Sequence, residues 1–153
     1  MTWRVRVELK KAFLDHRGEA LKREAHHFGL TGVRALRTGA VYELEGTLDQ
    51  TQALSIAGRL LADPITQEFS VAPPPKKDDF SGGRRAVVWL KKGVADPVAD
   101  TVFLASKDLS VQGLESVRSG HVFDFLGTLS GPDVRRFCEE HLMNSLIQTV
   151  DVC

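Results

Sequence analysis

The 153-residue sequence has little of what marks several functional classes. It has two cysteines, Cys138 and Cys153, and neither lies in a Cys-x-x-Cys or His/Cys cluster, which disfavours metal binding and redox catalysis. Twenty basic residues balance twenty acidic ones, which disfavours nucleic-acid binding through a broad basic face. No apolar run approaches the roughly 18 residues needed to span a membrane, and the charged N-terminus does not resemble a signal peptide. We therefore expect a cytoplasmic protein that binds neither membranes nor nucleic acid.

Signatures of catalysis are also missing. The sequence contains no P-loop, no Rossmann fingerprint, no nucleophile elbow and no zinc-ligand spacing. Apolar residues make up 42% and charged residues 26% of the chain, a composition typical of a globular protein. We therefore expect a folded chain with no autonomous active site, no catalytic residue and no metal.

The same pattern occurs twice along the chain. Residues 4–71 align with residues 85–152 at a constant offset of 81, and the alignment needs no gap. VELKKAFLD at 7–15, for example, matches VWLKKGVAD at 88–96. The constant register preserves turns and apolar positions together, so it indicates a duplication more strongly than the modest identity does. The predicted organisation is a first repeat at 1–71, a linker containing proline and glycine at 72–85, and a second repeat at 86–153.

Each repeat has the pattern expected of a β-α-β-β-α-β unit. Apolar and polar residues alternate in WRVRVEL, at 3–9, as in a half-buried strand. Asp15 and Asp96 each precede an amphipathic segment and are expected to cap the first helix of their repeat. Gly39 and Gly120, each preceded by a hydroxyl residue, are expected to form tight hairpin turns between the second and third strands.

This order of elements predicts the ferredoxin-like arrangement, an α+β fold with both helices on one face of the sheet. A unit of about 70 residues buries a low fraction of its surface and leaves its second sheet face open. We therefore expect the two ferredoxin-like units to pack together as a pseudo-dimer within one chain.

Several short motifs connect the first repeat with a known family. They are the strand end Leu9-Lys10, the helix start Asp15-His16-Arg17-Gly18, the segment from Gly29 to Val33, the Arg37-Thr38-Gly39 turn and the acidic Glu43-Leu44-Glu45. This pattern resembles PurS, the small subunit of phosphoribosylformylglycinamidine (FGAM) synthase, and extends over the whole first repeat. The second repeat resembles a diverged second PurS. It has Ala99 at the helix-start glycine, and Ala40 and His121 stand where PurS hairpins commonly have lysine.

The resemblance implies a function as well as the PurS-like fold. PurS bridges the ATP-dependent synthetase subunit, PurL, and the glutaminase subunit, PurQ. Their complex converts formylglycinamide ribonucleotide (FGAR), ATP and glutamine into FGAM in de novo purine biosynthesis. ATP and Mg are then expected only in the synthetase partner, with no cofactor in this chain. The alternative from a different class is a tandem ACT-like regulatory domain that senses a small molecule, because that family uses the same unit in pairs.

Basic residues at equivalent positions of the two repeats are the candidates for contact with a partner or a phosphate. Two lysines end the first strand of each repeat, and one arginine precedes each predicted turn. The other interpretation of the lysines is a solvated strand end that discourages edge pairing. The candidate contact residues are Lys10, Lys11, Arg37, Lys91, Lys92 and Arg118.

Overall fold

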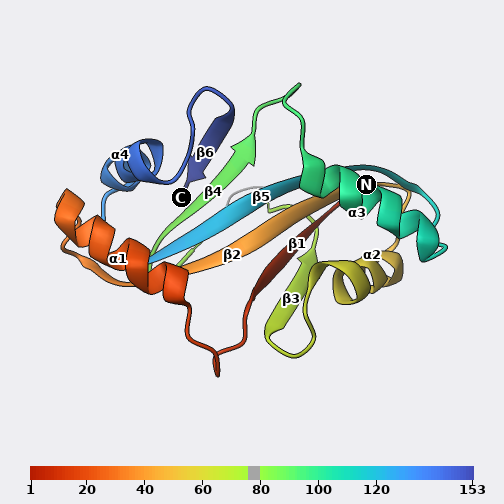
Figure 1. Ribbon diagram of the computed structural model, residues 1–153, viewed down its shortest axis with the longest axis horizontal. Helices are drawn as coiled ribbons and strands as arrows, with labels where there is room; N and C mark the ends of the chain where they lie inside the picture. Colours follow the sequence, from red (N-terminus) through yellow and green to blue (C-terminus); the bar gives the residue numbers. More distant parts are fainter. Residues whose placement is uncertain (76–79) are drawn as a thin grey trace. The chain divides into compact units, whose positions relative to one another are not determined.

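A computed structural model describes residues 1–75 and 80–153, and residues 76–79 of the predicted linker lie outside the described residues. Within the described chain, each repeat forms three strands and two helical segments (Figure 1). The first repeat contains β1 (Thr2–Leu9), α1 (His16–Phe28), β2 (Val33–Gly46), α2 (Gln50–Ile56), which continues as the π-helical turn η1 (Ala57–Leu61), and β3 (Gln67–Ala72). The second contains β4 (Gly83–Leu90), α3 (Pro97–Asp108), β5 (Leu114–Gly127), α4 (Gly131–His141) and β6 (Gln148–Val152).

The middle strand of each repeat is continuous, so the hairpin turns expected at Gly39 and Gly120 were wrong. β2 and β5 each run for 14 residues through these positions. The tight hairpin turn that the Thr-Gly and Ser-Gly pairs suggested needs positive φ, and neither glycine is among the residues with positive φ. A valine precedes each glycine within its strand, and a valine and an aromatic residue follow it, which favours extended backbone. A Ser/Thr-Gly pair permits a turn without imposing one. Each repeat therefore has one long strand where two short strands were expected.

The chain forms two compact units that do not coincide with its two repeats. Unit 1 consists of Met1–Phe13, Ala40–Lys76 and Ala95–Gly120, and unit 2 consists of Leu14–Gly39, Lys77–Val94 and His121–Cys153. The segments 14–39 and 95–120 are equivalent at the offset of 81. Each holds the first helix of a repeat and the first half of its long strand, and each belongs to the unit built mainly from the other repeat.

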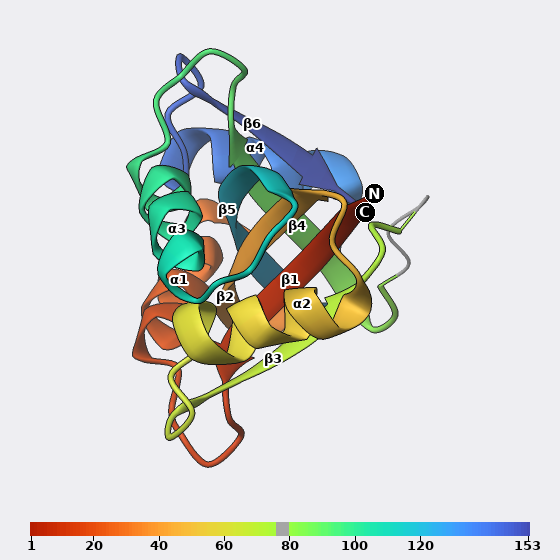
Figure 2. The same ribbon diagram turned by 90° about the vertical axis from the view of Figure 1, so that its right-hand side faces the viewer.

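Unit 1 is a four-stranded sheet with its helices on one face. Its strand order is β3-β1-β2-β5, with the second half of β2 and the first half of β5. β1 and β3 pair antiparallel, and α2 lies in front of them in Figure 2. The indole N–H of Trp3 donates to the carbonyl oxygen of Leu48 at 2.9 Å. Helix α3, from the second repeat, contributes to the core, which comprises Trp3, Val5, Val7, Leu44, Leu48, Ala53, Ile56, Ala57 and Val102.

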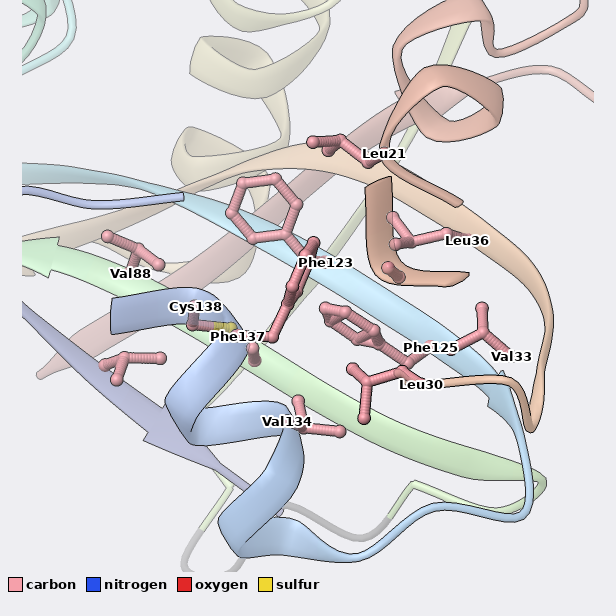
Figure 3. Close-up of a cluster of buried hydrophobic side chains, with 13 residues drawn as sticks. Leu21, Leu30, Val33, Leu36, Val88, Phe123, Phe125, Val134, Phe137 and Cys138 are labelled. Atoms are coloured by element: carbon pink, nitrogen blue, oxygen red, sulfur yellow. The ribbon is translucent and has the colours of Figure 1, made fainter. Parts of the chain in front are cut away.

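Unit 2 has the same design with the roles of the repeats reversed. Its strand order is β2-β5-β4-β6, with the first half of β2 and the second half of β5, and β4 pairs antiparallel with β6. Helices α1 and α4 lie together, since the ring of Phe28 meets the ring of Phe137 edge-on at 5.5 Å between centroids. Phe125 meets Phe137 in the same way at 5.9 Å (Figure 3). Edge-to-face pairs of this kind add to the stability given by burial.

The α+β fold class, with two ferredoxin-like units in one chain, is confirmed. Each unit combines four strand segments with two helices, but one helix and one strand segment come from the other repeat. The exchanged helices are anchored by core residues, Leu21 and Ala25 of α1 in unit 2 and Val102 of α3 in unit 1. One repeat alone therefore cannot build either unit as it occurs in this chain.

Cutting the linker should leave the two halves associated, because each unit contains segments from both sides of the linker. We expect a variant with a protease site inserted in the linker to keep, after cleavage, the mass of both halves together in native mass spectrometry. The uncut chain in the same buffer is the control. Separation into two free fragments under native conditions would contradict the exchange of segments.

The buried thiol of Cys138 should report the folding of unit 2. Cys138 is fully buried in the unit 2 core, and burial raises the pKa of its thiol to about 12. Since the thiolate is the reactive form, we expect no labelling of Cys138 by a thiol reagent at pH 8 in the folded chain, and full labelling after denaturation. A Cys153→Ser variant leaves one cysteine, so intact-mass spectrometry reads its labelling directly. Rapid labelling of the native variant would contradict the packing described.

Candidate functional site

Asp15 ties the start of α1 to the middle of β2 within unit 2. One carboxylate oxygen accepts a hydrogen bond from the backbone N–H of Gly18 at 2.8 Å, so Asp15 is the N-cap of α1. The other accepts from the backbone N–H of Thr38 at 2.6 Å and from its hydroxyl at 3.0 Å. A capping carboxylate satisfies helix N–H groups that have no partner inside the helix. Here the same side chain also positions the helix on its strand.

Asp96 makes the equivalent contacts within unit 1. Its carboxylate accepts from the backbone N–H of Ala99 at 3.0 Å, and from the backbone N–H and hydroxyl of Ser119 at 2.9 and 2.7 Å. Both aspartates are thus engaged by backbone and hydroxyl donors. This engagement supports a structural role and leaves little of either carboxylate for acid–base chemistry.

The lysine pairs lie at the ends of their strands, each beside a turn of its own unit. The backbone N–H of Lys10 donates to the carbonyl oxygen of Thr66 at 2.9 Å, and that of Lys91 donates to Ile147 at 2.8 Å. The loop after β1 therefore lies next to the turn before β3, and the loop after β4 lies next to the turn before β6 (Figure 1). We call residues 10–13 and 63–66 tip 1, and residues 91–94 and 144–147 tip 2.

Each tip also presents an apolar side chain that sequence reasoning had not assigned to the surface. Ile65 in tip 1 is 74% exposed and Leu146 in tip 2 is 84% exposed. Both are held by the same turn geometry, since their backbone N–H groups donate to Asp63 at 2.9 Å and to Asn144 at 3.0 Å. The sequence contained one signal for these surface residues, an apolar residue at the equivalent position of each of two turns. Whether such a residue is exposed depends on the geometry of the turn, which the sequence alone does not give.

The two tips differ in charge. In tip 1 the ammonium group of Lys10 donates to the carbonyl oxygen of Pro64 at 2.7 Å. The backbone N–H of Ile65 lowers the pKa of the Asp63 carboxyl, and the positive charge of Lys10 lowers it further, so Asp63 is anionic. Tip 2 has Asn144 at the position equivalent to Asp63, and its two lysines are exposed.

The remaining candidates do not belong to either tip. Arg37 and Arg118 are exposed residues within the long strands β2 and β5. Gly39 and Gly120 lie two residues further along the same strands, in extended backbone. Both arginines therefore belong to the long strands, whereas the lysine pairs follow the ends of β1 and β4 beside turns.

Next to the Asp96 cap, the two repeats have diverged. Tyr42 in unit 1 has a raised pKa, mainly because its hydroxyl is partly buried and also because Asp96 is negatively charged. The equivalent residue in unit 2 is Phe123, which has no hydroxyl and lies under the guanidinium of Arg17 at 5.4 Å. The scaffold is repeated, but the electrostatic environment of the equivalent side chain is not.

The described residues contain neither a metal-binding cluster of side chains nor a helix that could span a membrane. No group of three or more His, Cys, Asp or Glu side chains is placed there to hold a metal ion. Nor is any helix in this part of the chain both long enough and apolar enough to cross a membrane. Adjacent positions on a helix point about 100° apart, and Nε2 of His26 on α1 lies 2.7 Å from the carbonyl oxygen of Val33.

The fold and the two tips define a duplicated ferredoxin-like α+β protein with candidate contact residues on its surface. The family model of PurS, described as phosphoribosylformylglycinamidine (FGAM) synthase, matches residues 2–73 and again residues 85–153. The chain belongs to the PurS family, which supplies a subunit of FGAM synthase in purine biosynthesis.

Individual relatives resemble one half of the chain. The phosphoribosylformylglycinamidine synthase subunit PurS of Mycobacterium leprae is 32% identical over 69 residues, which cover 44% of this chain and 87% of that protein. The crystal structure of Methanocaldococcus jannaschii PurS has 18% identity and a TM-score of 0.42, with 46% of this chain and 92% of that one covered. The structure of B. subtilis PurS has 24% identity and a TM-score of 0.42, with 46% of this chain and 94% of that one covered.

Replacing Asp15 by alanine should destabilise the chain more than an ordinary loss of a helix cap. The change removes the cap, typically worth about 1 kcal/mol, and leaves the N–H of Thr38 without its acceptor, which costs a further ~1–3 kcal/mol. We expect the free energy of unfolding to fall by about 2–4 kcal/mol in urea titrations. The exposed first-turn residue Glu19 is the matched control, and Glu19→Ala should cost less than about 1 kcal/mol. Equal losses for the two variants would contradict the role of Asp15 as a link between helix and strand.

Proposed function

We propose that this chain is a non-catalytic bridging subunit of FGAM synthase that links the PurL-type synthetase to the PurQ-type glutaminase. Membership of the PurS family supports the placement in this enzyme. The observation that supports bridging is the presence of an equivalent contact surface in each compact unit. Tip 1 and tip 2 each join two lysines to a protruding apolar residue.

Such a surface has the properties of a protein contact. An apolar side chain that protrudes can enter a pocket of a partner and provide much of the binding free energy, while charges around it guide the encounter and select the partner. Two surfaces of this kind on one chain allow two partners to be bound at the same time. The second partner is then held near the first at a high effective concentration.

The two capping aspartates have a structural use that is compatible with a non-catalytic role. Asp15 and Asp96 are engaged in capping and strand contacts. In the proposed complex, ATP and Mg are bound by the synthetase, which acts on FGAR, and glutamine is hydrolysed by the glutaminase. The bridging chain would hold the two subunits together, so that nitrogen released from glutamine is used by the synthetase.

A duplicated chain suits this role better than two separate copies. Both halves are made in a 1:1 ratio, and each half is free to change without altering the other. The differences between Asp63 and Asn144 and between Tyr42 and Phe123 are changes of this kind. The first difference alters a surface turn, and the second alters a side chain that is buried in unit 2, on a common scaffold.

Leaving this chain out should abolish one of two activities of the reconstituted enzyme. With purified PurL-type and PurQ-type subunits, we expect FGAM formation from glutamine to require the chain, and FGAM formation from added ammonia to persist without it. In size-exclusion chromatography with light scattering, the three proteins should elute as one complex. The double variant Ile65→Asp/Leu146→Asp should weaken this complex, whereas Leu104→Asp, at a 63% exposed helix residue outside both tips, should not. A full glutamine-dependent rate without the chain would refute the proposal.

A further inference from the structure

Tip 2 is a positively charged surface whose charges are not compensated locally. Lys91 and Lys92 are exposed, and their side chains form no ion pair or hydrogen bond with any residue that the structure describes. Residues 91–94 and 144–147 contain no aspartate or glutamate. Tip 2 therefore has two positive charges. Lys10, Lys11 and Asp63 together give tip 1 a net charge of one positive unit.

The apolar part of tip 2 is a rigid protrusion. Leu146 is 84% exposed and the adjacent Ile147 is 40% exposed. The turn that presents them is held by four hydrogen bonds of Asn144. Its side chain accepts from the N–H of Leu146, its carbonyl oxygen accepts from the N–H groups of Ile147 and Gln148, and its own N–H donates to the side chain of Gln148. A contact that is already ordered loses little conformational entropy on binding.

In tip 1 the equivalent groups are arranged differently. Its exposed apolar residues, Phe13 and Ile65, come from two different segments, and Lys10 is bound to Pro64 beside the anionic Asp63. An acidic partner would gain less from tip 1, because part of the positive charge is already neutralised and Asp63 would repel nearby carboxylates. The two tips therefore suit different partners.

We propose that tip 2 docks one partner subunit of FGAM synthase through an apolar pocket of that subunit that is bordered by carboxylates, and that tip 1 does not replace it. This inference rests on the proposed function and adds the chemistry of one of its two contacts. Leu146 and Ile147 enter the pocket, and Lys91 and Lys92 pair with the carboxylates around it. A phosphate or a nucleic acid would use the lysines but would give the two apolar side chains no partner, so the combination favours a protein.

The test measures binding of the full chain to the purified synthetase and glutaminase subunits by biolayer interferometry, with matched variants of the two tips. We expect Lys91→Glu/Lys92→Glu and Leu146→Ala each to weaken binding of the same subunit by about tenfold or more. Lys10→Glu/Lys11→Glu and Ile65→Ala should change the affinity for that subunit by less than about threefold. Added salt should weaken wild-type binding but strengthen binding of the Lys91→Glu/Lys92→Glu variant, because salt screens the attraction in the first case and the like-charge repulsion in the second.

Each outcome separates this inference from the proposed function. If the wild-type chain binds neither subunit, the proposed function fails. If it binds while the tip 2 variants bind equally well, or while the tip 1 variants lose the same partner to the same degree, the assignment of tip 2 fails and bridging stands. If the lysine substitutions weaken binding but Leu146→Ala does not, the lysines bind a phosphate or another polyanion, and the proposal of an apolar pocket is overturned. Lys91→Arg/Lys92→Arg should bind like the wild type, and equal melting temperatures of all variants show that the fold is intact.

Discussion

The uninterrupted extension of β2 and β5 is the constraint on which the rest of the structure depends. Because β2 does not turn at Gly39, the chain passes from unit 2 into unit 1 within one strand, and β5 does the converse at Gly120. Each unit must then take one of its two helices from the other repeat, namely the first helix of that repeat. Asp15 and Asp96 hold these helices on the strands that accompany them, through bonds to Thr38 and Ser119. Each unit therefore contains the same arrangement, a helix from the other repeat that an aspartate holds on its strand.

This arrangement lets the halves of the chain diverge without loss of the fold. At the start of α1, a Cβ atom on Gly18 would lie 2.1 Å from the carbonyl oxygen of Leu36, so glycine is needed there. The equivalent Ala99 is buried at the start of α3, so unit 1 has room for the methyl group. The tips differ in the same manner, with a carboxylate at Asp63 and an amide at Asn144 serving the same turn. A common framework with separate surfaces is what the proposed binding of two different partners requires.

Much of the fold and part of the candidate site could be predicted from residue patterns. The offset of 81, the alternating strands and the motifs around Leu9-Lys10 and Arg37-Thr38-Gly39 predicted a duplicated PurS-like chain, and the family match supports that interpretation. The lysine pairs were recognised as strand ends. Ile65 and Leu146 were not recognised as surface residues, because an apolar residue in a sequence is by default expected inside. Only the turn that presents each of them shows otherwise.

The sequence by itself determined which residues cap, alternate and repeat, because capping and periodicity depend on neighbours a few positions away. Only the tertiary structure decided whether Gly39 and Gly120 turn or extend, because a glycine permits both conformations at little cost. That choice depends on strands and helices distant along the chain, which are bound in place only when the whole sheet of each unit forms. The folded chain therefore decides which segments form each unit. It also decides which residues surround each exchanged helix.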